Sequence, residues 1–482
     1  MLNKLFRDAF VYGAAGMLSK SLAWILLPIY VKALSAEEFG AWDLMLTFGI
    51  LVNLTVALEI SQGISRYWND VTDAIEQKLL ASTGLWFSVI MYSLFIVVAL
   101  GFSRSLNYWL LSDAKYLDST RLAIFYIGVN GIFLILLNQF RWELRSKEYA
   151  LISIIYSVMT IFFTLSVFVF FGGGLIGIVL AQLIAAGIGI VMCWWLLQNR
   201  YVLRIDLKKL RMLLQFSAPL VPAGIAVFIS LYISRFFIKY SEGLEGVARF
   251  AFATKVASVV MFLIFALQIA LMPIVYRYHE ERKTPNQISK LLRWFVSAAI
   301  VACLSLSLFS KELIIVIGAS DFLISSDFIC VLAPAILISQ MYIFSPGISI
   351  AKKSMLQLWV GLSASIVSGI GNWLMVPLLG LWGASIATLL SAITFLTLWV
   401  HLSQKYYYIP YPLKSALISI LTYVALVLLG RYLDNITLGY SLLCFFKIVL
   451  IFFQCALLFM AGIINSRDIN YLMIKFLKKI TS

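Results

Sequence analysis

The chain has 482 residues, of which 62% are hydrophobic and only 12% are charged. This composition excludes a set of water-soluble domains, which is what a chain of this length would otherwise form. A mean hydropathy of +0.97 indicates a membrane protein instead. Because about 20 apolar residues cross the bilayer as a helix, the chain has room for a dozen or more spans. The apolar runs are continuous and do not alternate, which favours helices over a β-barrel.

The first apolar run begins near Phe10 and is predicted to be a retained span. It contains Lys20 and lacks the small-residue cleavage site of a signal peptide. In chain order we predict about fourteen spans, near residues 10–33, 41–60, 82–102, 119–140, 150–171, 177–197, 213–238, 250–272, 291–309, 328–348, 356–376, 382–402, 414–430 and 441–463.

The charge of the chain predicts its orientation. There are 37 Lys and Arg against 22 Asp and Glu, a net charge of +15. Most of the basic residues fall in connections that lie on the same side as the N-terminus. The positive-inside rule therefore places both termini in the cytoplasm, and an even number of spans agrees with this.

A repeat appears when the chain is shifted along itself by 206 positions. One block of identical residues then aligns, namely Gly174, Leu175, Gly177, Ala181 and Leu183 with Gly380, Leu381, Gly383, Ala387 and Leu389. Six spans per repeat return the chain to the same side, so the two repeats are parallel. We predict a first lobe at residues 1–205, a second lobe at 206–405, and two further helices within 406–482. Two such six-helix lobes in a V shape suit alternating access, and the alternative is a duplicated scaffold without that function.

Basic side chains inside the predicted spans are the first functional candidates, because burying charge in a membrane is costly. They are Lys20, Arg235, Lys255 and Lys447. The nearby acids, Asp43, Glu59 and Asp327, fall close to span ends, so the deep positions have an excess of cations. A cavity lined by such cations would attract phosphate and repel a cationic drug. Alternatively, each side chain reaches an interface or pairs with an acid from another span.

Three further features have weaker signals. Pro219 and Pro222, followed by Gly224, are expected to break or kink the seventh span, as a gate or merely for packing. Arg66 follows the second span and could meet an anionic headgroup at the inner side. The five cysteines lack CxxC spacing and the two histidines are far apart, so we expect no metal site and no disulfide framework.

Several segments resemble a known family of transporters. They include LSKSLAWILLPIYVKALSAEEFGAWDL at 18–44, SAPLVPAG at 217–224, SRFFI at 234–238 and the long apolar passage at 249–273. Together these resemble the Wzx-type O-antigen flippases, in the polysaccharide-exporter branch of the multidrug/oligosaccharidyl-lipid/polysaccharide superfamily. One departure is Ser234, where the family often has Asp, which leaves Arg235 without that neighbouring acid and its pairing open.

The resemblance implies an inner-membrane protein that moves undecaprenyl-pyrophosphate-linked oligosaccharide from the cytoplasmic to the periplasmic leaflet. We expect Lys20, Arg235 and Lys255 to bind the pyrophosphate, with Arg66 assisting and Lys447 as an accessory residue. Membrane lipids, a glycan polymerase and a chain-length regulator are the candidate partners. We expect no cofactor, no metal and no nucleic acid, and a proton or sodium gradient is the candidate for coupling.

Other functions stay open from the sequence. The cargo could be another lipid-linked glycan, such as a peptidoglycan precursor or a teichuronic or exopolysaccharide unit. A cation-coupled drug exporter ranks lower, because the first span has no carboxylate between Asp8 and Glu37. From a different class, a membrane-embedded glycan polymerase or glycosyltransferase would handle the same lipid carrier but would need catalytic groups on a large outer loop.

Overall fold

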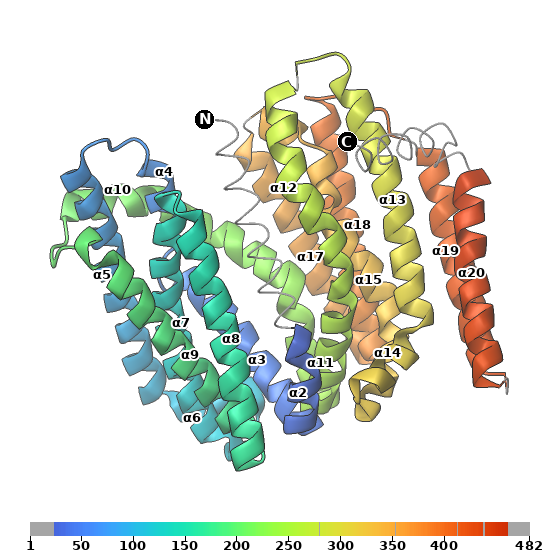
Figure 1. Cartoon of the computed structure of the whole chain (residues 1–482), viewed down its shortest axis with the longest axis horizontal. Helices are drawn as coiled ribbons and strands as arrows, with labels where there is room; N and C mark the ends of the chain where they lie inside the picture. Colours follow the sequence, from blue (N-terminus) through green and yellow to red (C-terminus); the bar gives the residue numbers. More distant parts are fainter. Residues whose placement is uncertain (1–23, 279, 352, 412, 437–438, 461–482) are drawn as a thin grey trace, which may run out of the picture. The chain divides into compact units, whose positions relative to one another are not determined.

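The structure is a computed structural model that describes residues 24–278, 280–351, 353–411, 413–436 and 439–460. Helices and short connections make up this part of the chain (Figure 1). The α-helices before the predicted second lobe are α2 (Leu27–Ala33), α3 (Ala36–Thr55), α4 (Ile60–Tyr67), α5 (Ala74–Gly101), α6 (Ser103–Leu111), α7 (Leu117–Trp142), α8 (Ser146–Phe171) and α9 (Leu175–Leu197). Those that follow are α10 (Leu207–Ser217), α11 (Val221–Ala257), α12 (Met261–Tyr278), α13 (Thr284–Leu308), α14 (Ser310–Ile317), α15 (Ser326–Gln340), α16 (Gly347–Ile350), α17 (Ser354–Leu379), α18 (Leu381–Gln404), α19 (Leu413–Asp434) and α20 (Tyr440–Met460).

Many of these helices can cross a membrane. Eleven helical segments of the described chain are long and apolar enough, or twelve if α3 and α4, which meet at a 48° bend, form one span. The predicted span at 213–238 and most of the one at 250–272 fall within one helical stretch at 207–265. Most of the first predicted span lies outside the described residues. The chain is therefore an all-helical, multi-pass membrane protein, and the count of fourteen stays a prediction.

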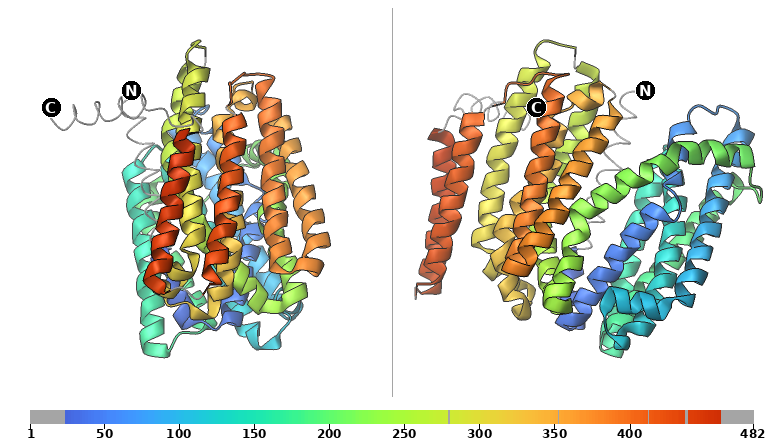
Figure 2. Two further views of the ribbon diagram at one scale, coloured as in Figure 1. Left: turned by 90° about the vertical axis from the view of Figure 1, so that its right-hand side faces the viewer. Right: turned by 180° about the vertical axis from the view of Figure 1, so that it is seen from behind.

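The helices group into two compact units. Of the described residues, the first unit contains those up to Ala251, together with 317–319 and 368–381, and the second unit contains the others. Within the first unit, α9 packs against both α7 and α8, and α7 packs against α5 (Figure 1). Within the second unit, α13 contacts α15, α19 and α20, and the last two helices run side by side (Figure 2). These units follow packing rather than the sequence repeat, so the predicted lobe boundaries at 205 and 405 stay predictions.

The two copies of the repeated block begin their helices in the same way. Gly174 and Gly380, with φ of +89° and +55°, directly precede α9 and α18. In each case a glutamate from elsewhere in the chain accepts a hydrogen bond from the first helical N–H. Glu38 accepts from Leu175 at 3.4 Å, and Glu242 accepts from Leu381 at 2.9 Å. A carboxylate at a helix N-terminus satisfies an unpaired donor and complements the helix dipole.

These two contacts predict that Glu38→Gln and Glu242→Gln each lower the free energy of unfolding by about 1 kcal/mol, the usual effect of weakening a helix cap. The measurement is thermal unfolding of the purified protein in detergent. Glu245→Gln is the matched control, because Glu245 is an exposed residue that pairs with Arg249 on its own helix. A midpoint unchanged by Glu242→Gln would show that the cap contributes nothing.

Candidate functional site

A buried ion pair joins α11 to α3 within the first unit. Nε of Arg235 lies 2.6 Å from Oδ2 of Asp43, and both side chains are almost completely buried. Nη1 of Arg235 also donates to the carbonyl oxygen of Leu231 at 3.4 Å. The guanidinium lies over the rings of Tyr232 and Phe250, at 5.1 and 5.9 Å from their centroids. The arginine is therefore held on one side by a carboxylate and enclosed by aromatic rings, a setting that strengthens electrostatic contacts.

This pair corrects the expectation that the deep cations lack matching acids. Ser234 stands where the family often has an acid, but Arg235 takes its carboxylate from Asp43, 192 positions away in the sequence. Asp43 lies on the second turn of α3 and is 3% exposed, so it is buried despite its place near a predicted span end. The alternative that a deep cation pairs with an acid from another span is confirmed for Arg235.

A second buried cation on α11 was missed by the sequence reasoning. Lys239 follows Arg235 by four residues, one helical turn, and is 7% exposed. Its ammonium donates to the carbonyl oxygen of Trp109, on α6. The predicted span ends at residue 238, so this lysine falls just outside it. The signal that could have found it is the absence of Gly or Pro between Arg235 and Gly243, the position where the backbone of α11 leaves helical geometry.

Lys447 is also paired. It is completely buried in the second unit, where its Nζ lies 2.6 Å from Oε1 of Glu312 and 2.8 Å from Oδ1 of Asp434. Lys311 approaches Asp434 at 3.6 Å as well. Two carboxylates offset this ammonium, so the expected excess of positive charge is wrong here too. An accessory role for Lys447 in phosphate binding has no support in these surroundings and stays only a prediction.

The other predicted ligands have different settings. Lys20 lies outside the described residues. Arg66 is exposed on α4, pairs with Asp70 at 2.9 Å and lies over the ring of Tyr67. Lys255 is half-buried near the end of α11, in the part of that helix that belongs to the second unit. The structure thus pairs Arg235 with Asp43 and places Lys239 one helical turn farther along α11, and neither residue is in the predicted set.

The proline segment does interrupt the helix. Ala218–Leu220, which contains Pro219, forms a short 3-10 helix between α10 and α11, and Pro222 is in the first turn of α11. Proline disrupts α-helical hydrogen bonding, which explains the change of geometry. A Cβ atom on Gly224 would lie 3.2 Å from the side chain of Leu54, so this glycine packs closely near the bend between α3 and α4. The break is confirmed, and its action as a gate stays a prediction.

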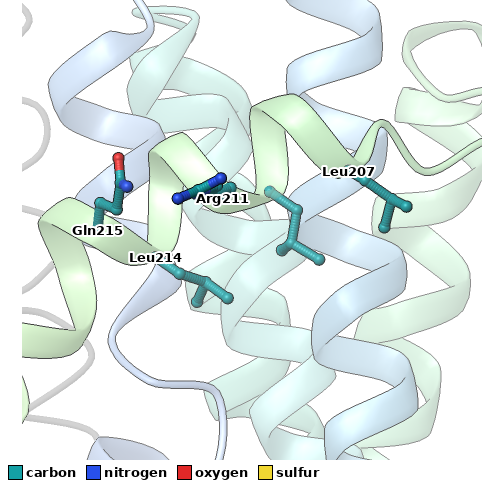
Figure 3. A pocket seen from close by; sticks show the side chains of 5 residues that line it. Leu207, Arg211, Leu214 and Gln215 are labelled. Atoms are coloured by element: carbon teal, nitrogen blue, oxygen red, sulfur yellow. The ribbon is translucent and has the colours of Figure 1, made fainter.

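One shallow hollow of about 450 Å³ lies on α10 (Figure 3). Its lining comes from a single helix, namely Leu207, Leu210, Arg211, Leu214 and Gln215. Because leucines dominate this face and one helix supplies the whole lining, the hollow is a surface depression rather than an enclosed binding site. Within the described residues, no group of three or more His, Cys, Asp or Glu side chains is arranged to hold a metal ion.

Comparison with known proteins decides the family. The family model described as "Polysaccharide biosynthesis protein" matches residues 5–279, more than half of the chain. The chain belongs to the polysaccharide biosynthesis protein family. A Haemophilus influenzae protein named for the Lsg locus is 22% identical to this chain over 304 residues, which cover 60% of this chain and 70% of that protein.

Solved structures show which fold this member of the family adopts. The lipid II flippase MurJ, in an inward closed conformation, aligns with a TM-score of 0.72 and 14% identity, covering 95% of this chain and 99% of MurJ. An inward-facing MATE family multidrug transporter aligns with a TM-score of 0.61 and 16% identity, covering 82% and 99% of the two chains. The MATE transporter VcmN of Vibrio cholerae aligns with a TM-score of 0.59 and 15% identity, covering 84% and 96%. The family member therefore has the fold of these transporters, and none of the three is an enzyme.

Proposed function

We propose that this protein is a flippase that carries a lipid-linked glycan across the bacterial inner membrane by alternating access. Its finer assignment is an undecaprenyl-pyrophosphate-linked oligosaccharide, the O-antigen repeat unit, moved from the cytoplasmic to the periplasmic leaflet. The observation that supports it is the pair of buried basic side chains, Arg235 and Lys239, one turn apart on a helix of a membrane protein from a polysaccharide biosynthesis family. Buried cations are costly in a membrane and serve binding of an anion such as diphosphate.

In this proposal Lys20, Arg235 and Lys255 contact the pyrophosphate, Arg66 assists at the inner side, and the polyprenyl tail stays in lipid. Both termini lie in the cytoplasm, and Pro219 and Pro222 allow α11 to bend as the carrier changes state. A proton or sodium gradient, or the supply of substrate, drives the cycle. A glycan polymerase and a chain-length regulator are the proposed partners that use the flipped unit.

The test is complementation of a bacterial strain that lacks its own O-antigen flippase. We expect surface glycan from the unchanged protein and a loss of at least tenfold from Lys20→Ala and from Arg235→Ala, because a charged hydrogen bond to phosphate contributes about 1.5 to 3 kcal/mol. Lys115→Ala is the control, since Lys115 is an exposed residue that pairs with Glu37 and Asp113. Membrane levels of each variant are measured in parallel. Normal surface glycan from both Lys20→Ala and Arg235→Ala would contradict the roles of these cations.

A second cargo is favoured by one observation, the high structural similarity to a lipid II flippase over 95% of the chain. A peptidoglycan precursor has the same diphosphate and polyprenyl groups as the O-antigen carrier lipid and differs in its sugar. Rescue of a strain depleted of its lipid II flippase, together with failure in the O-antigen strain, would assign this cargo instead.

A further inference from the structure

Three buried charged residues belong to the first unit: Asp43 on α3, its partner Arg235 on α11, and Lys239, one helical turn after Arg235. All three residues are more than nine-tenths buried. Two cations and one carboxylate leave this group, the Asp43 cluster, with one net positive charge. Burial of an uncompensated charge is expensive, so such a cluster requires a functional reason.

The unbalanced charge belongs to Lys239. Its ammonium donates to the carbonyl oxygen of Trp109, which is a neutral dipole. An ammonium has three donors, and one carbonyl uses only one of them. Among the ion pairs of the described residues, Arg235 has Asp43 as its partner and Lys239 has none. The ring of Tyr240, 4.9 Å from the ammonium, adds only a weak cation–π contact.

The spacing of the two cations suits a diphosphate. Residues four apart on a helix lie on the same face, with Cβ atoms about 6 Å apart. Arginine binds one phosphate group as a fork and lysine binds a second as a point charge. A diphosphate group carries at least two negative charges, enough to offset the two positive charges of Arg235 and Lys239. In the present arrangement, the carboxylate of Asp43 supplies only one negative charge.

We propose that Lys239 binds the diphosphate of the substrate and that Asp43 is an internal anion which this diphosphate displaces from Arg235. The inference rests on the proposed function for the identity of the ligand. Anion exchange of this kind spares Arg235 from ever being buried without a partner, which would cost far more than either bound state. Asp43, once displaced, needs water or a new donor, so binding of the substrate also loosens the contact between α3 and α11.

The experiment measures binding of farnesyl diphosphate to the purified full chain in nanodiscs. We expect Lys239→Met to weaken binding at least tenfold and Lys239→Arg to restore most of it, because the site needs a cation. Asp43→Asn is expected to tighten binding several-fold, because the competing carboxylate is gone. In cells, the same variant is expected to lower the yield of surface glycan. Lys115→Met, a change at an exposed lysine, is the control and should bind as the unchanged protein does. Farnesyl monophosphate should lose less affinity than the diphosphate when Lys239 is replaced.

The outcomes separate this inference from the proposed function. If the unchanged protein does not bind farnesyl diphosphate, the proposed function fails, and this inference fails with it. If the unchanged protein binds farnesyl diphosphate, but Lys239→Met and Asp43→Asn bind it with the same affinity as the unchanged protein, the inference alone is overturned. If Lys239→Met does not yield monodisperse protein, the other two variants decide: tighter binding by Asp43→Asn with retained binding by Lys239→Arg supports the inference, and weaker binding by Asp43→Asn overturns it.

Discussion

Lys447→Ala is expected to lower the free energy of unfolding by about 3 to 5 kcal/mol, the cost of leaving a buried charge without its partner. Lys447 lies 2.6 Å from Glu312 and 2.8 Å from Asp434, which belong to α14 and to the end of α19. Without the ammonium, two carboxylates face each other in a buried site. Because native proteins are stable by only about 5 to 15 kcal/mol, the variant should accumulate poorly and melt early. The measurement is the yield of monodisperse protein and its thermal unfolding midpoint.

The control for this result is a neutral version of the same cluster. Lys447→Met combined with Glu312→Gln and Asp434→Asn removes every charge of the triad, and it should recover much of the lost stability. Lys311→Met should have a small effect, because Lys311 is partly exposed and lies farther from Asp434, at 3.6 Å. If Lys447→Ala has the same unfolding midpoint as the unchanged protein, the ion pairs of Lys447 with Glu312 and Asp434 do not hold α20 in place.

Gly40→Ala is expected to destabilise the protein by about 1 to 3 kcal/mol, as overpacking does in a close-packed interior. Gly40 lies on α3, and a Cβ atom at this position would be 2.0 Å from the carbonyl oxygen of Leu244, on α11. The obstacle is backbone, so a change of side-chain conformation cannot relieve it. The two helices must move apart, and this movement also stretches the ion pair between Asp43 and Arg235. Thermal unfolding and complementation of surface glycan measure the two effects.

Gly49→Ala on the same helix is the matched control for this prediction. Its added Cβ atom would lie 3.1 Å from the flexible side chain of Ile127, which can rotate away. The expected loss is therefore smaller than for Gly40→Ala. Equal unfolding midpoints for the two variants would contradict the close approach of α3 and α11.

The membrane-spanning fold could be predicted because its signal is local. Long apolar runs separated by charged connections must form helices, since the bilayer offers no other partner for backbone groups. The repeat with Gly174 and Gly380 was also visible, because it consists of identical residues in one register, and each glycine directly precedes a helix. The break at Pro219 followed from the chemistry of a single residue type.

The charges inside the membrane could not be assigned in this way. Asp43 pairs with Arg235 and Glu312 pairs with Lys447, although these acids lie 192 and 135 positions away from their partners in the sequence. Lys239 was hidden as well, because the predicted span ends at residue 238 and the helix continues to Gly243. The sequence by itself determined the class of the protein, its helices and the presence of buried cations, because hydropathy and residue chemistry act locally. Which of these cations are neutralised depends on the tertiary structure. An ion pair requires two side chains within a few ångströms of each other, and here they come from helices that are far apart in the sequence.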